Sequence, residues 1–306
     1  SLARKHPGDK YYRTMSQPLD SSSRAAGIPI GIRAHLAHAA LQVLAQDAGV
    51  DILHIKGPAV HPSIGRALTH STDADVLVRP EQVKLYVKAL LDHGWRHNTS
   101  FETGSAFEHA ATFFHPTWGY VDLHRRYPGI TAPKAFNNLW ARRIHQMLGG
   151  VRCATPALID QRLILLLHVA RNSSGTSDPD YALVWATLDE CAQADLRRRA
   201  RELGAQVGLA AALGELDQYR QDPTHDLWMM FSTGEGGRLD EWKARFKAAN
   251  GPLAKARIVG RALLVNTDHL TMRLGHEPTP AEVRQEYVER YRAALREGMD
   301  KVKRKL

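Results

Sequence analysis

Asp73 and Asp75 are the two residues whose type and spacing most directly suggest chemistry. They lie in segment 72–78, which predicts a short β-strand. Because side chains alternate along a strand, both carboxylates project from one face, while Ala74 and Val76 turn into a core. Carboxylates on one face repel each other unless a proton or a cation lies between them, and an oxygen-only cluster suits Mg²⁺. We therefore expect a metal site at this strand.

A third carboxylate, Asp122, lies in the strand-like run 120–124. Val121 and Leu123 face inward there, so Asp122 and His124 share the opposite face. This strand could pair with the one that carries Asp73 and Asp75. His124 could orient Asp122 or a substrate, and a structural hydrogen bond is an equally good interpretation. An isolated Asp-x-Asp pair more often marks a solvated strand face or a helix cap, so the neighbouring elements are what favour the metal interpretation.

A candidate for binding an anion stands ahead of these strands. Segment 51–55 predicts a strand that runs into Lys56-Gly57, and a glycine turn lets the backbone approach a ligand closely. Lys56 would add a positive charge at the end of the strand, although such a lysine is more often a surface residue. His54 is expected to be structural, and Arg66 and His70 are candidate substrate contacts.

Composition limits the class of protein. The chain has 306 residues, is 43% hydrophobic and carries a formal charge of +9, so it can bury a core and its field should attract anions. No apolar run approaches the ~20 residues that span a bilayer, and residues 1–7 lack the apolar region of a signal peptide, so we expect a cytoplasmic protein with no membrane partner. Its two cysteines have neither zinc-site spacing nor a disulfide framework.

The elements that must position these residues begin after residues 1–28, which we expect to form an N-terminal arm. Apolar spacing predicts a helix at 32–48, and Pro80 and Gly94 bracket a second helix. One or two short strands, joined by a turn at 103–105, should lie between residues 95 and 112. The order helix, strand, strand, helix, strands predicts an α+β core with a small mixed sheet and flanking helices over residues 29–150.

The chain changes character after Pro128-Gly129, and residues 151–306 are expected to form a helical C-terminal domain. Helices are predicted at 156–170, 181–192, 195–216, 239–249 and 253–265, and a final helix opens at a possible capping box, Thr279 to Glu282. The run Arg197 to Arg201 is usually a solvated helix face, although it could follow phosphates.

Taken together, His54-Ile55-Lys56-Gly57, the 71–78 strand and Val121-Asp122-Leu123-His124 resemble the DNA polymerase β-like nucleotidyltransferase superfamily. More narrowly, they resemble its uncharacterised bacterial nucleotidyltransferase family, in which a Leu-Lys-Gly-like turn replaces the usual Gly-Ser turn. The likeness covers roughly residues 32–128. Beyond them, it is a general likeness to a helical C-terminal half, with Leu166-Leu167-His168 similar to a helix of that family. That family tends to carry an arginine shortly before the first aspartate, where this chain has His70-Ser71-Thr72.

The resemblance implies two-metal-ion nucleotidyl transfer, with displacement of pyrophosphate from an NTP. Asp73, Asp75 and Asp122 would hold Mg²⁺ (or Mn²⁺) ions and carry catalysis. Nucleotide binding would fall to a second set of residues, with His124 and His70 in support; this set is Lys56, Gly57, Arg66, Ser71 and Thr72. Lys56 would meet the phosphates as a point charge and Gly57 as a backbone donor.

The acceptor of the NMP group cannot be read from the residues. The positive charge makes RNA, and tRNA in particular, the leading hypothesis, with a protein or a small molecule as alternatives. A different class remains open: a non-catalytic nucleotide- or RNA-binding protein with the same fold. A basic helical adaptor is a third hypothesis, in which the first half serves as scaffold.

Overall fold

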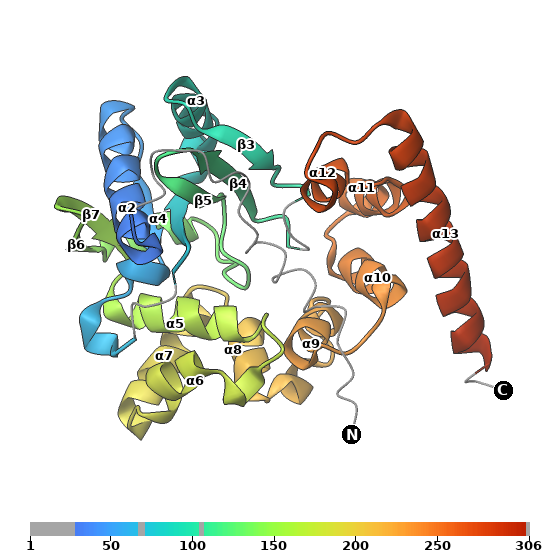
Figure 1. Cartoon of the computed structure of the whole chain (residues 1–306). Coiled ribbons are helices and arrows are strands. Elements are labelled where there is room, and N and C mark those ends of the chain that lie inside the picture. Colours follow the sequence, from blue (N-terminus) through green and yellow to red (C-terminus); the bar gives the residue numbers. More distant parts are fainter. Residues whose placement is uncertain (1–27, 67–70, 104–106, 304–306) are drawn as a thin grey trace. The chain divides into compact units, whose positions relative to one another are not determined.

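The computed structural model describes residues 28–66, 71–103 and 107–303, and it divides into two compact units between Glu215 and Leu216 (Figure 1). His70 and nearly all of the expected arm at 1–28 lie outside the described residues, as does most of the turn expected at 103–105. The expected domain boundary at residue 150 stays a prediction.

A five-stranded sheet organises the first unit (Figure 1). Its strands are β1 (Ile52–Ile55), β2 (Asp73–Val78), β3 (Arg96–Thr99), β4 (Ala110–His115) and β5 (Gly119–His124), and they lie in the order β1-β2-β5-β4-β3. β2 and β5 run parallel, while the other neighbours are antiparallel. A small mixed sheet with flanking helices is the α+β class that the sequence predicts, so that prediction is confirmed.

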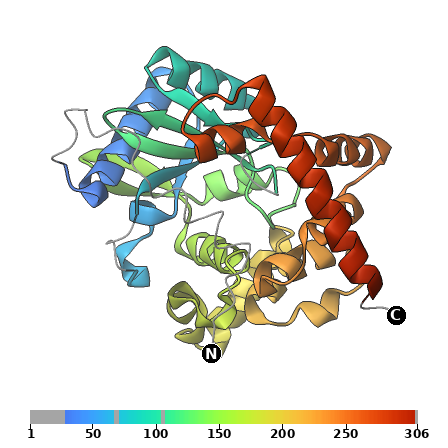
Figure 2. The ribbon, with the colours of Figure 1, turned by 45° about the vertical axis from the view of Figure 1, so that its right-hand side comes forward.

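Two helices, α2 (Ile30–Asp47) and α3 (Val83–Asp92), contribute to the core on one face of this sheet (Figure 2). Ala74, Val76 and Val78 of β2 are fully buried in that core. The hydroxyl of Tyr86 on α3 donates to the Leu41 carbonyl of α2 at 2.7 Å and ties the two helices together. Since the apolar side of β2 is used by the core, the alternate residues Asp73 and Asp75 are left for the other side.

A second, two-stranded sheet was not predicted from the sequence. β6 (Ile144–Leu148) and β7 (Val151–Thr155) form a hairpin closed by Gly149-Gly150, whose φ angles of 54° and 84° are typical of a tight hairpin turn. The hairpin packs closely against α2: a Cβ atom on Gly149 would come within 2.9 Å of the His35 carbonyl oxygen, so only glycine fits there. The sequence signal that could have predicted this hairpin is the Gly149-Gly150 pair between two short strand-like runs.

The remaining elements of the first unit are mostly helical. Helices α4 (Ala135–Ala141), α5 (Leu158–Val169), α6 (Pro179–Tyr181), α7 (Glu190–Glu202) and α8 (Gln206–Leu213) follow one another, with the 3₁₀ turn Gly175–Ser177 and a π-helical turn at Ala182–Ala186 between α5 and α7. Three earlier 3₁₀ turns lie between β1 and β2 (Gly57–Ala59 and Pro62–Ile64) and before α3 (Pro80–Gln82). The buried pair Arg199–Asp160 fixes α7 to α5, with Nε 2.6 Å from Oδ1. The single helix expected at 181–192 is wrong, because the Asp189 side chain caps a new helix by accepting from the Ala192 amide.

In the second unit, the regular elements of the described residues are all helices and helical turns. It contains the 3₁₀ turn Leu216–Tyr219 and helices α9 (His225–Thr233), α10 (Arg238–Ala248), α11 (Pro252–Leu263), α12 (Thr267–Leu274) and α13 (Pro280–Lys303), the last of which is the long helix in Figure 2. The expected capping box is present, since the Thr279 amide donates to Glu282 and the Glu282 amide donates to the Thr279 hydroxyl. None of the described helices combines the length and the apolar character needed to cross a bilayer.

A buried histidine pair lies within the covered side of the sheet. His38 of α2 and His54 of β1 are fully buried, and their Nδ1 atoms lie 2.8 Å apart. His54 Nε2 lies 3.1 Å from Gln42 Oε1, which can only accept, so the proton of His54 sits on Nε2 and its Nδ1 accepts from His38. Burial lowers the pKa of His38 to about 4 and also lowers the pKa of His54. Both rings are therefore neutral at pH 7, as expected of structural histidines.

Because burial lowers the pKa of these two histidines, we expect each of them to make the free energy of unfolding fall as the pH drops below about 6.5, and His38→Asn removes only the contribution of His38. Between about pH 6.5 and about pH 4, His38 and His54 bind protons in the unfolded chain but stay neutral in the folded chain. Each histidine therefore lowers the free energy of unfolding by roughly 1.4 kcal/mol for every unit by which the pH falls. Thermal melts at a series of pH values should show this slope, and His38→Asn should reduce it by the contribution of one histidine. An equal slope in the variant would contradict the assignment.

Candidate active site

The carboxylates meet because of the register between β2 and β5. The parallel pairing sets Asp75 directly opposite Asp122, and it sets Asp73 opposite Tyr120 and Leu77 opposite His124. Residues that face each other across neighbouring strands point to the same side of a sheet. Asp73, Asp75, Asp122 and His124 thus share the face that α2 and α3 do not cover, and the expected pairing of the two strands is confirmed.

Asp75 is the centre of this cluster. It is 5% exposed, and its Oδ1 atom lies 2.7 Å from the Lys56 ammonium and 2.8 Å from His124 Nε2. Burial alone would raise the pKa of Asp75, but Lys56 and the His124 hydrogen bond outweigh it and hold that pKa well below its usual value. Burial would also lower the pKa of Lys56, and the charge of Asp75 reverses this and raises it. The two groups therefore stay ionised as a buried pair.

Among the described residues, no ion pair of this kind is formed by the other two carboxylates, Asp73 and Asp122. Thr112 Oγ1 of β4 donates to Asp122 Oδ1 at 2.7 Å and holds that side chain in place. Burial, followed by the charge of Asp75, raises the pKa of Asp122. Burial, together with the charges of Asp75 and Asp122, raises the pKa of Asp73 to about 7. The cluster would therefore gain stability from a further proton or cation.

The donor set fits a divalent cation. Ligand atoms of Asp75, Asp122 and His124 lie within 4.8 Å of one another, whereas Asp73 is not part of that group. His124 donates from Nε2 to the ionised Asp75, so the lone pair of its neutral ring is on Nδ1, which is buried and has no hydrogen-bond partner among the described residues. Carboxylates suit Mg²⁺ or Mn²⁺, and an added imidazole is compatible with Mn²⁺.

A strained turn delivers Lys56 to the cluster. Lys56 has φ 57° and ψ −174°, a conformation that costs a non-glycine residue about 1–3 kcal/mol. Gly57 follows with φ 47°, and a Cβ on it would come within 2.5 Å of Ser71 Oγ. Ser71 in turn donates to the backbone oxygen of Asp73 at 3.0 Å. The absence of a side chain at Gly57 thus lets the turn lie directly against the beginning of β2.

Arg66, Thr72 and His70 were also expected to contact the substrate. Arg66 Nε lies 2.8 Å from Asp180 Oδ1, so this arginine already has a carboxylate partner in the helical part of the unit. Thr72 is exposed. For His70, which lies outside the described residues, the structure gives no position.

Several residues near the cluster were missed by the sequence interpretation. The ring of His109 lies 5.1 Å from that of His124, and the ring of Tyr127 stacks 5.9 Å away on the same histidine. Arg171, just after α5, has NH1 3.2 Å from His109 Nε2. Burial lowers the pKa of His109, and that of His168 on α5, well below the usual value. The Leu166-Leu167-His168 motif was the signal that this helix matters.

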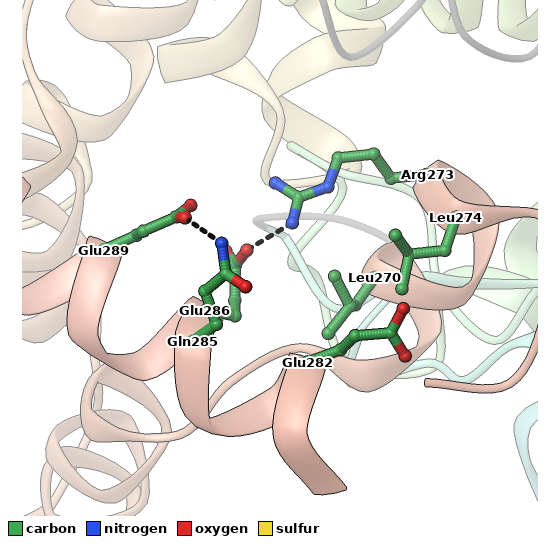
Figure 3. Close-up of a pocket in the computed structure, with 7 residues that line it drawn as sticks. All are labelled: Leu270, Arg273, Leu274, Glu282, Gln285, Glu286 and Glu289. Atoms are coloured by element: carbon green, nitrogen blue, oxygen red, sulfur yellow. Dashed lines mark hydrogen bonds and ion pairs between the residues drawn. The ribbon is translucent and has the colours of Figure 1, made fainter. Parts of the chain in front are cut away.

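A pocket in the second unit is separate from these residues. Figure 3 shows it between α12 and α13, lined by Leu270, Arg273, Leu274, Glu282, Gln285, Glu286 and Glu289. Arg273 pairs with Glu286, and Gln285 Nε2 donates to Glu289 Oε1 at 2.8 Å. Most of the polar side chains in this pocket are therefore matched with one another, and none of its lining residues belongs to the carboxylate cluster.

Comparisons with known proteins identify a family for most of the chain. Residues 17–219 match the sequence model of a family described as "uncharacterised nucleotidyltransferase". No curated protein matches significantly. Similar solved structures include the lincosamide antibiotic adenylyltransferase LnuA with bound lincomycin (15% identity, 55% of this chain and 96% of that one, TM-score 0.35) and the antibiotic-resistance factor ANT(2'')-Ia (12% identity, 63% of this chain and 100% of that one, TM-score 0.39). Likeness at these scores says nothing of the substrate of this chain.

Asp73→Asn should stabilise the protein in a chelator at about pH 8. The wild-type carboxyl keeps its proton in the folded state up to a pKa of about 7 but loses it in the unfolded state near its ordinary value, so wild-type stability falls as the pH rises through this window. Asparagine cannot ionise and avoids that loss.

Thermal melts with and without Mn²⁺ check this expectation, with Asp92→Asn as the control because Asp92 lies exposed on α3. The advantage of Asp73→Asn should shrink at about pH 5. A lower melting temperature than wild type in the chelator at the higher pH would show that Asp73 is not repelled by its neighbours.

Proposed function

The chain belongs to this family of nucleotidyltransferases, and we propose that it is a metal-dependent enzyme that moves an NMP group from an NTP to an acceptor. The observation that supports this most is the strand register, which sets Asp75 beside Asp122. The Lys56 ammonium is paired with the Asp75 carboxylate. Such a cluster serves transfer of a phosphoryl-type group, because that chemistry needs positioning and charge stabilisation more than covalent participation.

The sheet suggests an order for the substrates. Lys56 follows β1, Asp73 and Asp75 lie on β2, and Asp122 lies on β5, so cation and third carboxylate flank the central pair. In an in-line displacement the attacking and leaving oxygens lie on opposite sides of the α-phosphorus. We therefore place the leaving pyrophosphate on the side of Lys56 and the Gly57 amide, and the acceptor on the side of Asp122.

The carboxylates, His124 and Lys56 would each have a different role in the transfer. Asp122 takes the proton of the attacking hydroxyl, a task that its raised pKa favours, while Thr112 keeps its Oδ1 atom in place. Asp75, Asp122 and His124, whose ligand atoms lie close together, would hold Mg²⁺ or Mn²⁺, with Asp73 on the same face of β2 as a further proposed ligand. When bound, divalent ions neutralise charge on the attacking and leaving oxygens. Lys56 offsets charge on the departing phosphates.

A transfer assay with α-labelled NTPs tests the proposal. RNA, protein and small-molecule fractions are offered in turn, and label should appear in one of them. Asp122→Asn should lower the rate by at least about a hundredfold while the protein still folds, because general-base catalysis contributes on that order. Asp92→Asn, on the exposed side of α3, should transfer at the wild-type rate.

The outcomes separate the two functional classes. NTP binding without transfer into any fraction would favour the non-catalytic nucleotide-binding protein. Wild-type transfer by Asp122→Asn would remove Asp122 from the reaction.

We propose RNA, including tRNA, as the first acceptor class to test, because the whole chain carries a charge of +9. Three of the four arginines in the run on α7 do not support such binding, since they are matched with acids. Arg197 binds Glu215 through two bonds of 2.8 and 2.7 Å, Arg198 binds Asp195, and Arg199 is buried on Asp160. Exposed arginines of α13 such as Arg292 and Arg296 are better candidates.

If RNA is the acceptor, its binding should weaken steeply as salt is raised. Each phosphate contact adds about one unit to the slope of log affinity against log salt. Replacing Arg292 and Arg296 with glutamine should reduce that slope without changing NTP affinity. Replacing Arg197 should leave RNA affinity unchanged and loosen the contact of α7 with Glu215. An affinity that is flat in salt would exclude a polynucleotide and leave a protein or a small molecule.

A further inference from the structure

Arg171 is a buried cation that has no carboxylate partner in the part of the chain that the structure describes. It follows the last turn of α5 and is 8% exposed, a degree of burial that arginine rarely reaches unless it is paired with an acid. Its hydrogen-bond partners among the described residues are instead uncharged: the Leu167 carbonyl at 3.3 Å, His109 Nε2 at 3.2 Å and the Tyr127 hydroxyl at 3.4 Å. These contacts are long, so the guanidinium is held loosely for a buried charge.

The guanidinium lies next to the carboxylate cluster. Its partners His109 and Tyr127 both contact the ring of His124, at 5.1 and 5.9 Å between ring centroids, and His124 is bonded to Asp75. The positive charge of Arg171 acts to lower the pKa of Lys56, which shows that the two cations are close enough to repel each other. One turn earlier on α5, His168 has a buried Nδ1 atom with no hydrogen-bond partner among the described residues.

We propose that Arg171 binds the polyphosphate chain of the NTP, as the second cation of the site beside Lys56. A guanidinium presents a planar fork of donors that matches phosphate oxygens, and such charge-assisted bonds are about twice as strong as neutral ones. Phosphate would therefore replace the long contacts to neutral acceptors. Arg66, the arginine expected for this task, is bound to Asp180. This inference rests on the proposed function and adds a residue of α5 to it.

The competing explanation is structural, because Arg171 also links α5 to the segment before β4. Its guanidinium lies 5.9 Å from the Phe107 ring and bonds to His109. Arg126 holds the same segment by donating from NH2 to the Phe107 carbonyl at 2.7 Å, and its side chain is exposed. Arg126→Gln is thus a matched control that loosens the segment and leaves the proposed phosphate contact intact.

The test is calorimetric binding of inorganic tripolyphosphate in the presence of Mg²⁺, which needs neither an acceptor nor a preferred base. Arg171→Gln should weaken affinity at least about tenfold, a change of about 1.4 kcal/mol. Arg171→Lys should bind with intermediate affinity, since it keeps the charge and loses the fork. Arg126→Gln should bind as wild type does. Arg171→Lys also serves if the glutamine variant does not fold.

The inference is overturned if Arg171→Gln binds within about twofold of wild type, if Arg126→Gln weakens binding as much, or if wild type does not bind tripolyphosphate. Failure of the proposed function has a different signature. Tripolyphosphate binding that depends on Arg171, without label transfer to any acceptor, would uphold Arg171 and contradict the enzyme. Transfer by Arg171→Gln with an unchanged KM for NTP would contradict Arg171 alone.

Discussion

The Asp75 carboxylate is the constraint on which the rest of the site depends. It is buried, and a buried ionised carboxylate needs a partner, which the Lys56 ammonium and His124 supply on one oxygen. The ion pair fixes the turn after β1 against β2, and the hydrogen bond fixes β5 beside them. The unfavourable backbone conformation of Lys56 is maintained by two contacts: Gly57 packs closely against Ser71, and the Lys56 ammonium is paired with Asp75. Strain and buried charge of this kind are usual where a protein positions a ligand.

Much of this arrangement could be predicted from local sequence. Alternation alone assigns Asp73 and Asp75 to one face of β2 and Ala74 and Val76 to the other, because the period of a strand is two residues. The same rule assigns Asp122 to a face of β5. What it leaves open is which strands are neighbours and in which register, and the match of Asp75 to Asp122 depends on both. The three motifs, taken in order along the chain, made that pairing predictable.

The rest of the site could not be predicted because it depends on contacts between distant segments. Arg171 is a helix-terminal arginine in the sequence, and only the packing of α5 shows that it is buried without an acid. The arginine run on α7 shows the opposite case, since four arginines in five residues suggest a basic surface until Glu215 and Asp160 are seen beside them. Local composition reports charge, whereas the partners of that charge come from tertiary structure.

Binding of Mn²⁺, followed by electron paramagnetic resonance in the presence of a non-hydrolysable NTP analogue, tests the central claim most directly. If Asp75, Asp122 and their neighbours form a metal-dependent nucleotide site, the signal of free Mn²⁺ should be suppressed until about two ions per chain have bound. The analogue mixed with Mn²⁺ but without protein serves as the baseline. The account would be contradicted if the wild-type protein suppressed the free Mn²⁺ signal no more than that baseline does. It would also be contradicted if a variant with Asp75 and Asp122 both changed to asparagine suppressed the signal as much as wild type.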